Sequence, residues 1–308
     1  MKTTCGNMDI IDNSNSVFKI SGKIDVVDLA GMSVHCLRLD QIHPIVSGNK
    51  WFKLKYNLAH ALAGNASTIL TFGGAYSNHL IATAAAAEAF GLESIGMVRG
   101  AHRKENLTPT LKRCEDHGMQ LQFISREEYN QTKDMAWLHN LQQQHRGSFI
   151  IPEGGNNGLG IQGAAEIASL IPADATHVIL SVGSGATFTG IRNALDEHIQ
   201  ILGFAPMKNG RYLEKELQPS KQNWKLIDDY HFGGFGKWKD DLIVFMNEFY
   251  HLSNIPLDVV YTGKMLYGLK QLISSGYFPA NAKIVCIHTG GLQGNASVQE
   301  RLNYGLFQ

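Results

Sequence analysis

The sequence lacks three features that would each point to a class of protein. Its 27 basic and 27 acidic residues cancel, so no long-range field gathers polyanions, and we expect neither a nucleic-acid nor an anionic-membrane partner. The N-terminal residues are polar and no run approaches the roughly 18 apolar residues of a spanning helix, so we expect a cytoplasmic protein without a signal peptide. The four cysteines form no C-x-x-C pair, which argues against a zinc knot or a disulfide scaffold and predicts isolated reduced thiols at Cys5, Cys36, Cys114 and Cys286.

What remains is the composition of an ordinary globular protein with alternating strands and helices. The 308 residues allow about two domains of roughly 100 to 200 residues each. Apolar runs that end in glycine and precede helical patterns predict an α/β protein with parallel sheets. We expect strands at 68–72, 94–100, 120–125, 149–155, 177–182, 201–206 and 283–291, and helices at 77–91, 109–119, 133–146 and from about Ile191. Residues 207–240 are irregular and are interpreted as a loop excursion or a partner surface.

A glycine-rich turn follows the expected strand at 177–182 and reads Gly183-Ser184-Gly185-Ala186-Thr187. Successive backbone N–H groups at a helix N-terminus bind anions, so the turn is interpreted as a phosphate cup. The next glycine, Gly190, comes two positions too late for a dinucleotide fingerprint, and Ile191-Arg192 replaces the Lys-Ser or Lys-Thr of a P-loop. A small monophosphate fits better than a nucleotide, and a tight turn without a ligand is the alternative.

Three lysines lie within six positions after Ser47-Gly48-Asn49. Lys53 and Lys55 are expected to be solvated. Lys50 differs because the preceding glycine permits close approach of a ligand, and because Trp51 and Phe52 could desolvate its amine. Desolvation lowers a lysine pKa and makes the neutral nucleophile available for Schiff-base chemistry. An ordinary surface lysine is the alternative.

Small and polar side chains gather at the start of the helix expected at 77–91, in the run Gly73-Gly74-Ala75-Tyr76-Ser77-Asn78-His79. Ser77 or Asn78 could cap the helix, or the same donors could hold a substrate carboxylate. His79 stands where a hydrolase elbow would need glycine, which disfavours that class. The histidines show no metal-binding spacing, so we assign no metal.

Together these motifs occur in a specific order: S-G-N-K-W-F-K-L, F-G-G-A-Y-S-N-H, E-G-G-N-N-G-L-G, G-S-G-A-T, V-Y-T-G-K and H-T-G-G. The series resembles the pyridoxal-phosphate enzymes grouped as 1-aminocyclopropane-1-carboxylate deaminase and D-cysteine desulfhydrase, from about Arg38 to Gly294. The resemblance implies the fold type II, tryptophan-synthase-β-like architecture, in which each of two domains is a mostly parallel sheet with flanking helices. The expected domains are 1–50 plus 152–308, which holds the cofactor, and 51–151.

The resemblance also implies a role for each matching residue. Lys50 would join the aldehyde of pyridoxal 5'-phosphate, with catalytic roles for Ser77 in proton transfer and for Tyr261 beside the ring and the substrate. The cofactor would further contact Asn78 through its ring hydroxyl, Gly183, Ser184, Gly185, Ala186 and Thr187 through its phosphate, and Thr262 and Thr289 near its pyridine nitrogen. The substrate, a small amino acid, would meet Tyr76, Ser77, Asn78 and His79. Relatives of this kind suggest a homodimer.

Two departures from the family pattern bear on the reaction. Thr262 stands where the deaminases have an acidic residue that keeps the ring nitrogen protonated, and Tyr76 stands where both groups usually have glutamine. A neutral hydroxyl strengthens the electron sink less, which favours β-elimination over ring opening. We therefore expect a lyase of the D-cysteine desulfhydrase type that releases a 2-oxo acid, ammonia and a thiol or sulfide. The alternatives are a 1-aminocyclopropane-1-carboxylate deaminase, a non-catalytic protein that binds pyridoxal phosphate or another monophosphate, and a nucleotide-dependent α/β enzyme.

Overall fold

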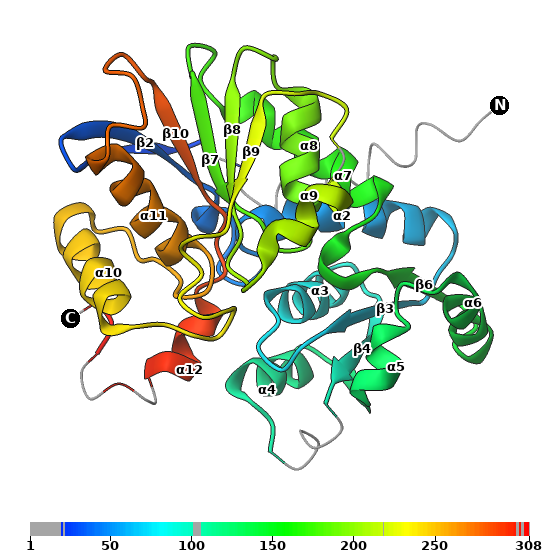
Figure 1. Ribbon diagram of the computed structural model, residues 1–308. Helices are drawn as coiled ribbons and strands as arrows, with labels where there is room; N and C mark the ends of the chain where they lie inside the picture. Colours follow the sequence, from blue (N-terminus) through cyan, green and yellow to red (C-terminus); the bar gives the residue numbers. More distant parts are fainter. Residues whose placement is uncertain are drawn as a thin grey trace.

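The chain forms two β-sheets with helices on both faces of each, as a computed structural model describes them for residues 20, 22–100, 106–217, 219–299, 302 and 305–307 (Figure 1). The six-stranded sheet has the order β1-β2-β10-β7-β8-β9, and the four-stranded sheet has the order β5-β4-β3-β6. The strands of the larger sheet are β1 (Ile24–Leu29), β2 (Met32–Arg38), β7 (His177–Ser181), β8 (Gln200–Phe204), β9 (Trp224–Ile227) and β10 (Ile284–His288). Those of the smaller sheet are β3 (Thr68–Gly73), β4 (Glu93–Arg99), β5 (Met119–Ile124) and β6 (Ser148–Ile151).

Parallel pairing dominates both sheets, as the sequence predicts. β1 and β2 form an antiparallel hairpin, and every other pair in the described chain is parallel. The strands are buried along most of their length, which explains why they read as continuous apolar runs. Parallel strands of one sheet end at the same edge of that sheet. The loops after β7 and β10 therefore lie at one edge of the larger sheet, and the loop after β3 lies at the carboxyl edge of the smaller sheet.

The helices cover the sheet faces and supply most of the core. They are α2 (Asn49–Ala63), α3 (Asn78–Ala89), α4 (Pro109–Asp116), α5 (Arg126–Asn130), α6 (Met135–Gln144), α7 (Gly158–Ala165), α8 (Ala186–Ala194), α9 (Leu213–Leu217), α10 (Asp240–Ser253), α11 (Thr262–Ser274) and α12 (Ala296–Gln299). Short 3-10 turns lie at η1 (Leu39–Gln41), η3 (Glu153–Gly155), η4 (Glu166–Leu170), η5 (Gly210–Tyr212) and η6 (Leu292–Asn295). Local signals place several starts: Thr108 caps α4 with Pro109 in its first turn, and Ser125 and Glu128 form a capping box on α5.

One apolar core runs through both sheets by way of α2. Trp51, Phe52 and Leu54 of α2 share it with Ile69 and Ile151 of the smaller sheet. The same cluster reaches α8 and strands β7 and β8 of the larger sheet, while α10 and α11 cover the opposite face of that sheet. The division into 1–50 plus 152–308 and 51–151 stays a prediction. No helix in the described ranges has both the length and the apolar character needed to cross a membrane.

Two local expectations are wrong. The segment 207–240 is not only a loop, because it contributes the edge strand β9, whose four residues were too short to stand out by periodicity. The helix expected from Ile191 begins at Ala186, because Gly190 belongs to its interior, where an added Cβ would lie 2.5 Å from the carbonyl oxygen of Ile161 in α7. That glycine permits close packing of the two helices rather than marking a helix start.

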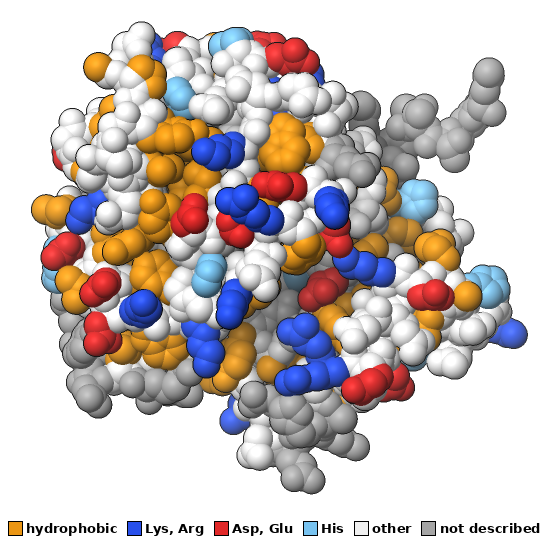
Figure 2. Space-filling model, viewed as in Figure 1, with side chains coloured by type: hydrophobic (Ala, Val, Ile, Leu, Met, Phe, Trp, Pro, Cys, Tyr) orange, Lys and Arg blue, Asp and Glu red, His pale blue; other side chains and the backbone are white. Residues whose placement is uncertain are grey.

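The three cysteines in the described residues are free but not all isolated. Cys36 of β2 and Cys286 of β10 face each other in the parallel register, and Cys114 is buried under α3; Cys5 lies outside the described residues. Charges of both signs are interspersed on the face shown in Figure 2, in keeping with the zero net charge.

Candidate functional site

Lys50 stands in the first turn of α2, directly against the end of β10. Gly48 precedes the helix with φ at +65°, and a Cβ there would overlap the carbonyl oxygen of Thr289. The Asn49 amide donates to that same oxygen at 3.3 Å. Only glycine combines this backbone conformation with such close approach, so Gly48 sets the position from which Lys50 projects.

The amine of Lys50 is chemically unusual. It donates to Asn49 Oδ1 at 2.6 Å, and Asn49 Nδ2 donates in turn to Thr187 Oγ1 at 2.8 Å. Burial lowers the pKa of Lys50 to about 8, although the negative charge of Asp258 opposes the effect. A neutral amine is therefore accessible near neutral pH, which is what a Schiff-base nucleophile requires.

The glycine-rich turn after β7 leads into the N-terminus of α8. Gly185 adopts a left-handed conformation just before Ala186, and the first-turn amides of α8 have no partner inside the helix. Ser184 Oγ lies 3.5 Å from Gly154 O, and a Cβ on Gly183 would lie 3.3 Å from the ring of Tyr261. Unpaired amides and a helix dipole make this turn suited to an anion.

Lys53 and Lys55 are not solvated as expected, since both are buried. The reason is that α2 packs on α7 and on the shared core, so little of its surface meets water. Lys55 forms an ion pair with Glu166. Lys53 turns toward the glycine-rich turn. An added Cβ on Gly154 would lie 3.9 Å from Lys53 Nζ, and the carbonyl oxygen of Gly154 contacts Ser184 of that turn. Burial and the neighbouring Lys50 hold the pKa of Lys53 well below its usual range.

Ser77, Asn78 and His79 take different positions at the start of α3. Ser77 caps the helix, its Oγ accepting from the amides of His79 at 3.2 Å and Leu80 at 3.3 Å. Asn78 Nδ2 donates to Gly291 O at 3.1 Å, while Asn78 Oδ1 is buried with no hydrogen-bond partner. Asn78 thereby reaches the H-T-G-G turn with an acceptor to spare.

The side chain of His79 points elsewhere. Its Nε2 lies 2.9 Å from Thr71 Oγ1, whose hydroxyl donates to Ile151 O at 2.8 Å, so the ring must donate to Thr71. Burial lowers the pKa of His79 well below its usual range, helped by Lys53 and Lys50. The ring is therefore neutral and packed inside the smaller sheet's layer, whereas Tyr76 remains substantially exposed.

Tyr261 and Thr262 begin α11 and depend on a residue that the sequence reasoning missed. Asp258 Oδ1 accepts from the amides of both, at 2.9 Å for Thr262, and Thr262 Oγ1 accepts from the Asp258 amide at 2.8 Å. Asp258 is fully buried, its Oδ2 has no partner, and burial raises its pKa to about 6. Burial likewise raises the pKa of Tyr261, which is a neutral phenol. An aspartate shortly before a helix start is a capping signal that could have pointed to it.

The irregular segment 207–240 also reaches the site. The ring of Phe235 lies edge-on to that of Tyr261, with centroids 6.0 Å apart. Lys264 of α11 holds this stretch, because its buried Nζ donates to Gly234 O at 2.6 Å and His231 O at 3.0 Å. The local sequence pattern does not predict these contacts, because they join segments about 30 residues apart.

The structure thus gathers the amine of Lys50, the glycine-rich turn beside Thr187, the free acceptor of Asn78 and the neutral phenol of Tyr261. This is the set of groups that a phosphorylated aldehyde cofactor requires: an amine, a phosphate cup and polar partners for a ring. A family model of pyridoxal-phosphate dependent enzymes matches residues 22–290, and the chain belongs to this family.

Its relatives bear two kinds of name. A Pyrococcus horikoshii protein provisionally named 1-aminocyclopropane-1-carboxylate deaminase is 29% identical over 292 residues, covering 88% of each chain. The D-cysteine desulfhydrase of Yersinia enterocolitica is 26% identical over 310 residues, covering 92% of this chain and 93% of the relative. A solved 1-aminocyclopropane-1-carboxylate deaminase homologue superposes with a TM-score of 0.79 at 26% identity, over 95% of this chain and 99% of the homologue. The expected fold type and cofactor are confirmed.

Proposed function

We propose that the protein is a lyase of the D-cysteine desulfhydrase type, which converts a small β-substituted amino acid and water into a 2-oxo acid, ammonia and a thiol or sulfide. The observation that carries the proposal is the amine of Lys50, whose pKa burial lowers to about 8, linked through Asn49 to Thr187 of the glycine-rich turn. The D-cysteine desulfhydrase relative, similar over nearly its whole length, supports the leaving group.

The residues present fit pyridoxal phosphate. The first-turn amides of α8 and the buried amine of Lys53 would hold the phosphate, since a bound anion would favour the charged form of a lysine whose charge is costly to bury alone. The unpartnered Asn78 Oδ1 would accept from the ring hydroxyl. Thr262 and Thr289 remain our assignments for the pyridine nitrogen side.

The cofactor, when bound, supplies the electron sink for the bond broken at the substrate α-carbon. The chain's own groups do the rest. Lys50 holds or gives up a proton at Nζ, kept in place by Asn49 Oδ1, and its lowered pKa lets it act in both roles near pH 8. Tyr261 stays protonated and acts as a hydrogen-bond donor rather than a base. Ser77, with its Oγ already accepting two amides, keeps its hydroxyl proton available for donation toward the substrate.

Ring opening of 1-aminocyclopropane-1-carboxylate to 2-oxobutanoate and ammonia is the second candidate, favoured by the names of several relatives. Against it, the position after Tyr261 is Thr262, which is fully buried and neutral. We therefore rank elimination first. Each reaction consumes one water, and their products differ, so one set of incubations separates them.

The test is to incubate the cofactor-loaded protein with D-cysteine, L-cysteine and 1-aminocyclopropane-1-carboxylate, and to quantify sulfide, pyruvate and 2-oxobutanoate. Sulfide and pyruvate in equal amounts from a cysteine support the proposal. The Lys50→Ala variant should lose turnover, whereas Lys55→Met, on the same helix but paired with Glu166, should keep it. Release of 2-oxobutanoate alone would transfer the assignment to the deaminase, and inertness toward all three would refute both.

The homodimer expected from the family resemblance remains a prediction, which sedimentation equilibrium would test.

A further inference from the structure

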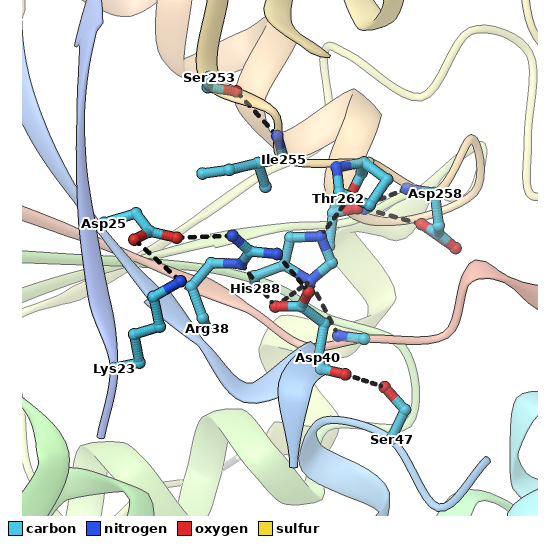
Figure 3. A network of polar contacts seen from close by, with 12 residues as sticks. Lys23, Asp25, Arg38, Asp40, Ser47, Ser253, Ile255, Asp258, Thr262 and His288 are labelled. Atoms are coloured by element: carbon cyan, nitrogen blue, oxygen red, sulfur yellow. Dashed lines mark hydrogen bonds and ion pairs between the residues drawn. The ribbon is translucent and has the colours of Figure 1, made fainter. Parts of the chain in front are cut away.

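His288, the last residue of β10, touches three separate segments with one buried ring (Figure 3). Its Nε2 lies 2.7 Å from Pro256 O, and its Nδ1 lies 3.2 Å from the Gly290 amide nitrogen. Asp40 Oδ1 lies 3.4 Å from the same Nδ1. The ring therefore sits where the segment before α11, the H-T-G-G turn and the segment before α2 meet.

The backbone partners define the tautomer. A carbonyl oxygen can only accept, so Nε2 carries the hydrogen that Pro256 O receives; an amide can only donate, so Nδ1 offers a lone pair to Gly290. His288 is therefore neutral when both contacts are made. Protonation at Nδ1 would remove the acceptor that Gly290 uses and would turn the ring toward Asp40.

The carboxylate that faces the ring already has a cationic partner, so it does not require a protonated His288. Arg38 donates to both oxygens of Asp40, at 2.9 and 2.7 Å, and also to Asp25 at 2.6 Å, which in turn pairs with Lys23 (Figure 3). The carboxylate next to His288 is thus already neutralised by a guanidinium. Burial of the ring further lowers the pKa of His288.

Each segment next to His288 leads directly into the site. Pro256 is two residues from Asp258, which caps the helix of Tyr261 and Thr262. Gly290 lies between Thr289, whose carbonyl supports α2, and Gly291, whose carbonyl receives Asn78. On the third side, Ser47 Oγ donates to Asp40 O at 3.1 Å, three residues before Lys50.

We propose that His288 is a positioning residue, which fixes the segment of Thr289 relative to that of Tyr261–Thr262 through its two backbone contacts, while the Asn49 amide ties the start of α2 to Thr289 O. The inference rests on the proposed cofactor site and adds a residue that contacts neither cofactor nor substrate. It predicts that loss of either ring nitrogen's hydrogen bond weakens binding of pyridoxal phosphate.

Two substitutions of His288 each remove the hydrogen bond of one ring nitrogen and keep that of the other. His288→Gln retains a donor that can reach Pro256 O but has no acceptor next to Gly290, and His288→Asn does the reverse. His177, buried at the start of β7 and bonded to Thr176 Oγ1 at 2.8 Å, is the matched control, changed to Gln. For each chain without cofactor we would measure the thermal midpoint and the hydrogen exchange of peptides covering 254–262 and 288–295, and then the dissociation constant for pyridoxal phosphate from its absorbance.

We expect faster exchange of 288–295 in His288→Gln and of 254–262 in His288→Asn, with cofactor binding about tenfold weaker in each, the effect of one lost buried hydrogen bond. His177→Gln should lower the thermal midpoint comparably and leave cofactor binding unchanged. Unchanged binding in both His288 variants, or equal weakening in His177→Gln, would overturn the inference while leaving the proposed function intact. Failure of the unaltered chain to bind pyridoxal phosphate would instead overturn the proposed function, and this inference with it.

Discussion

The titration of Lys50 makes the sharpest prediction. With its pKa lowered from 10.5 to about 8, about one amine in eleven is neutral at pH 7, against about one in 3,000 for an unperturbed lysine. The buried environment therefore raises the reactive fraction about 300-fold. We expect the reaction of Lys50 with pyridoxal phosphate to be half-maximal near pH 8.

The assay is to mix protein and pyridoxal phosphate over a pH series, trap the adduct with borohydride and quantify the labelled peptide by mass spectrometry. Asp258 supplies a second arm, because its negative charge raises the pKa of Lys50 and Asp258→Asn removes that charge while keeping the Oδ1 that caps α11. The half-point of labelling should therefore move to lower pH in Asp258→Asn.

Three results would refute the reasoning about this amine. A half-point near 10.5 would mean that Lys50 is solvated, and an unchanged half-point in Asp258→Asn would mean that the two charges do not interact. Recovery of the label at Lys53 would move the nucleophile one helical turn along α2.

Four further outcomes follow from the geometry. Gly48→Ala should lower the free energy of unfolding by about 3 kcal/mol or more, because the new Cβ strains a positive φ and overlaps a carbonyl oxygen. Gly158→Ala, with open space around it, should be tolerated, and equal thermal midpoints of the two variants would contradict this reasoning. Ser77→Ala should lose about 1 kcal/mol in urea unfolding through its missing cap. Lys53→Met should weaken binding of pyridoxal phosphate at least about tenfold but not that of pyridoxal, which lacks the phosphate. Because burial raises the pKa of Asp258 from 3.8 to about 6, its contribution to stability falls by about 3 kcal/mol as pH rises through that window, a slope that Asp258→Asn should abolish.

Local sequence motifs were enough to predict many of the strands and turns. The strands, the glycine turn at 183–185 and the cap at Ser77 depend on neighbouring residues, whose propensities and hydrogen bonds act within a few positions. The family resemblance then tied these turns to one cofactor. Lys53 was misjudged because its solvation depends on α7 and the shared core, far along the chain.

Asp258 and His288 were not predicted at all. Asp258 has a local signal in its position before α11, but its effect on Lys50 and the contact of His288 with Pro256 arise only when segments more than 30 residues apart converge. A carboxylate or an imidazole reads as an ordinary polar side chain until burial removes its water. Its pKa and its hydrogen-bond partners are then set by whatever surrounds it.

The amino-acid sequence by itself determined the α/β alternation, the glycine loops and the order of motifs that identifies the cofactor, because these are properties of contiguous residues. The tertiary structure alone decided that Lys53 and Lys55 are buried, that Asp258 opposes the pKa shift of Lys50, and that His288 joins the H-T-G-G turn to the segment before α11. Those properties depend on distance and burial, and both arise only when parallel strands bring remote loops to one edge.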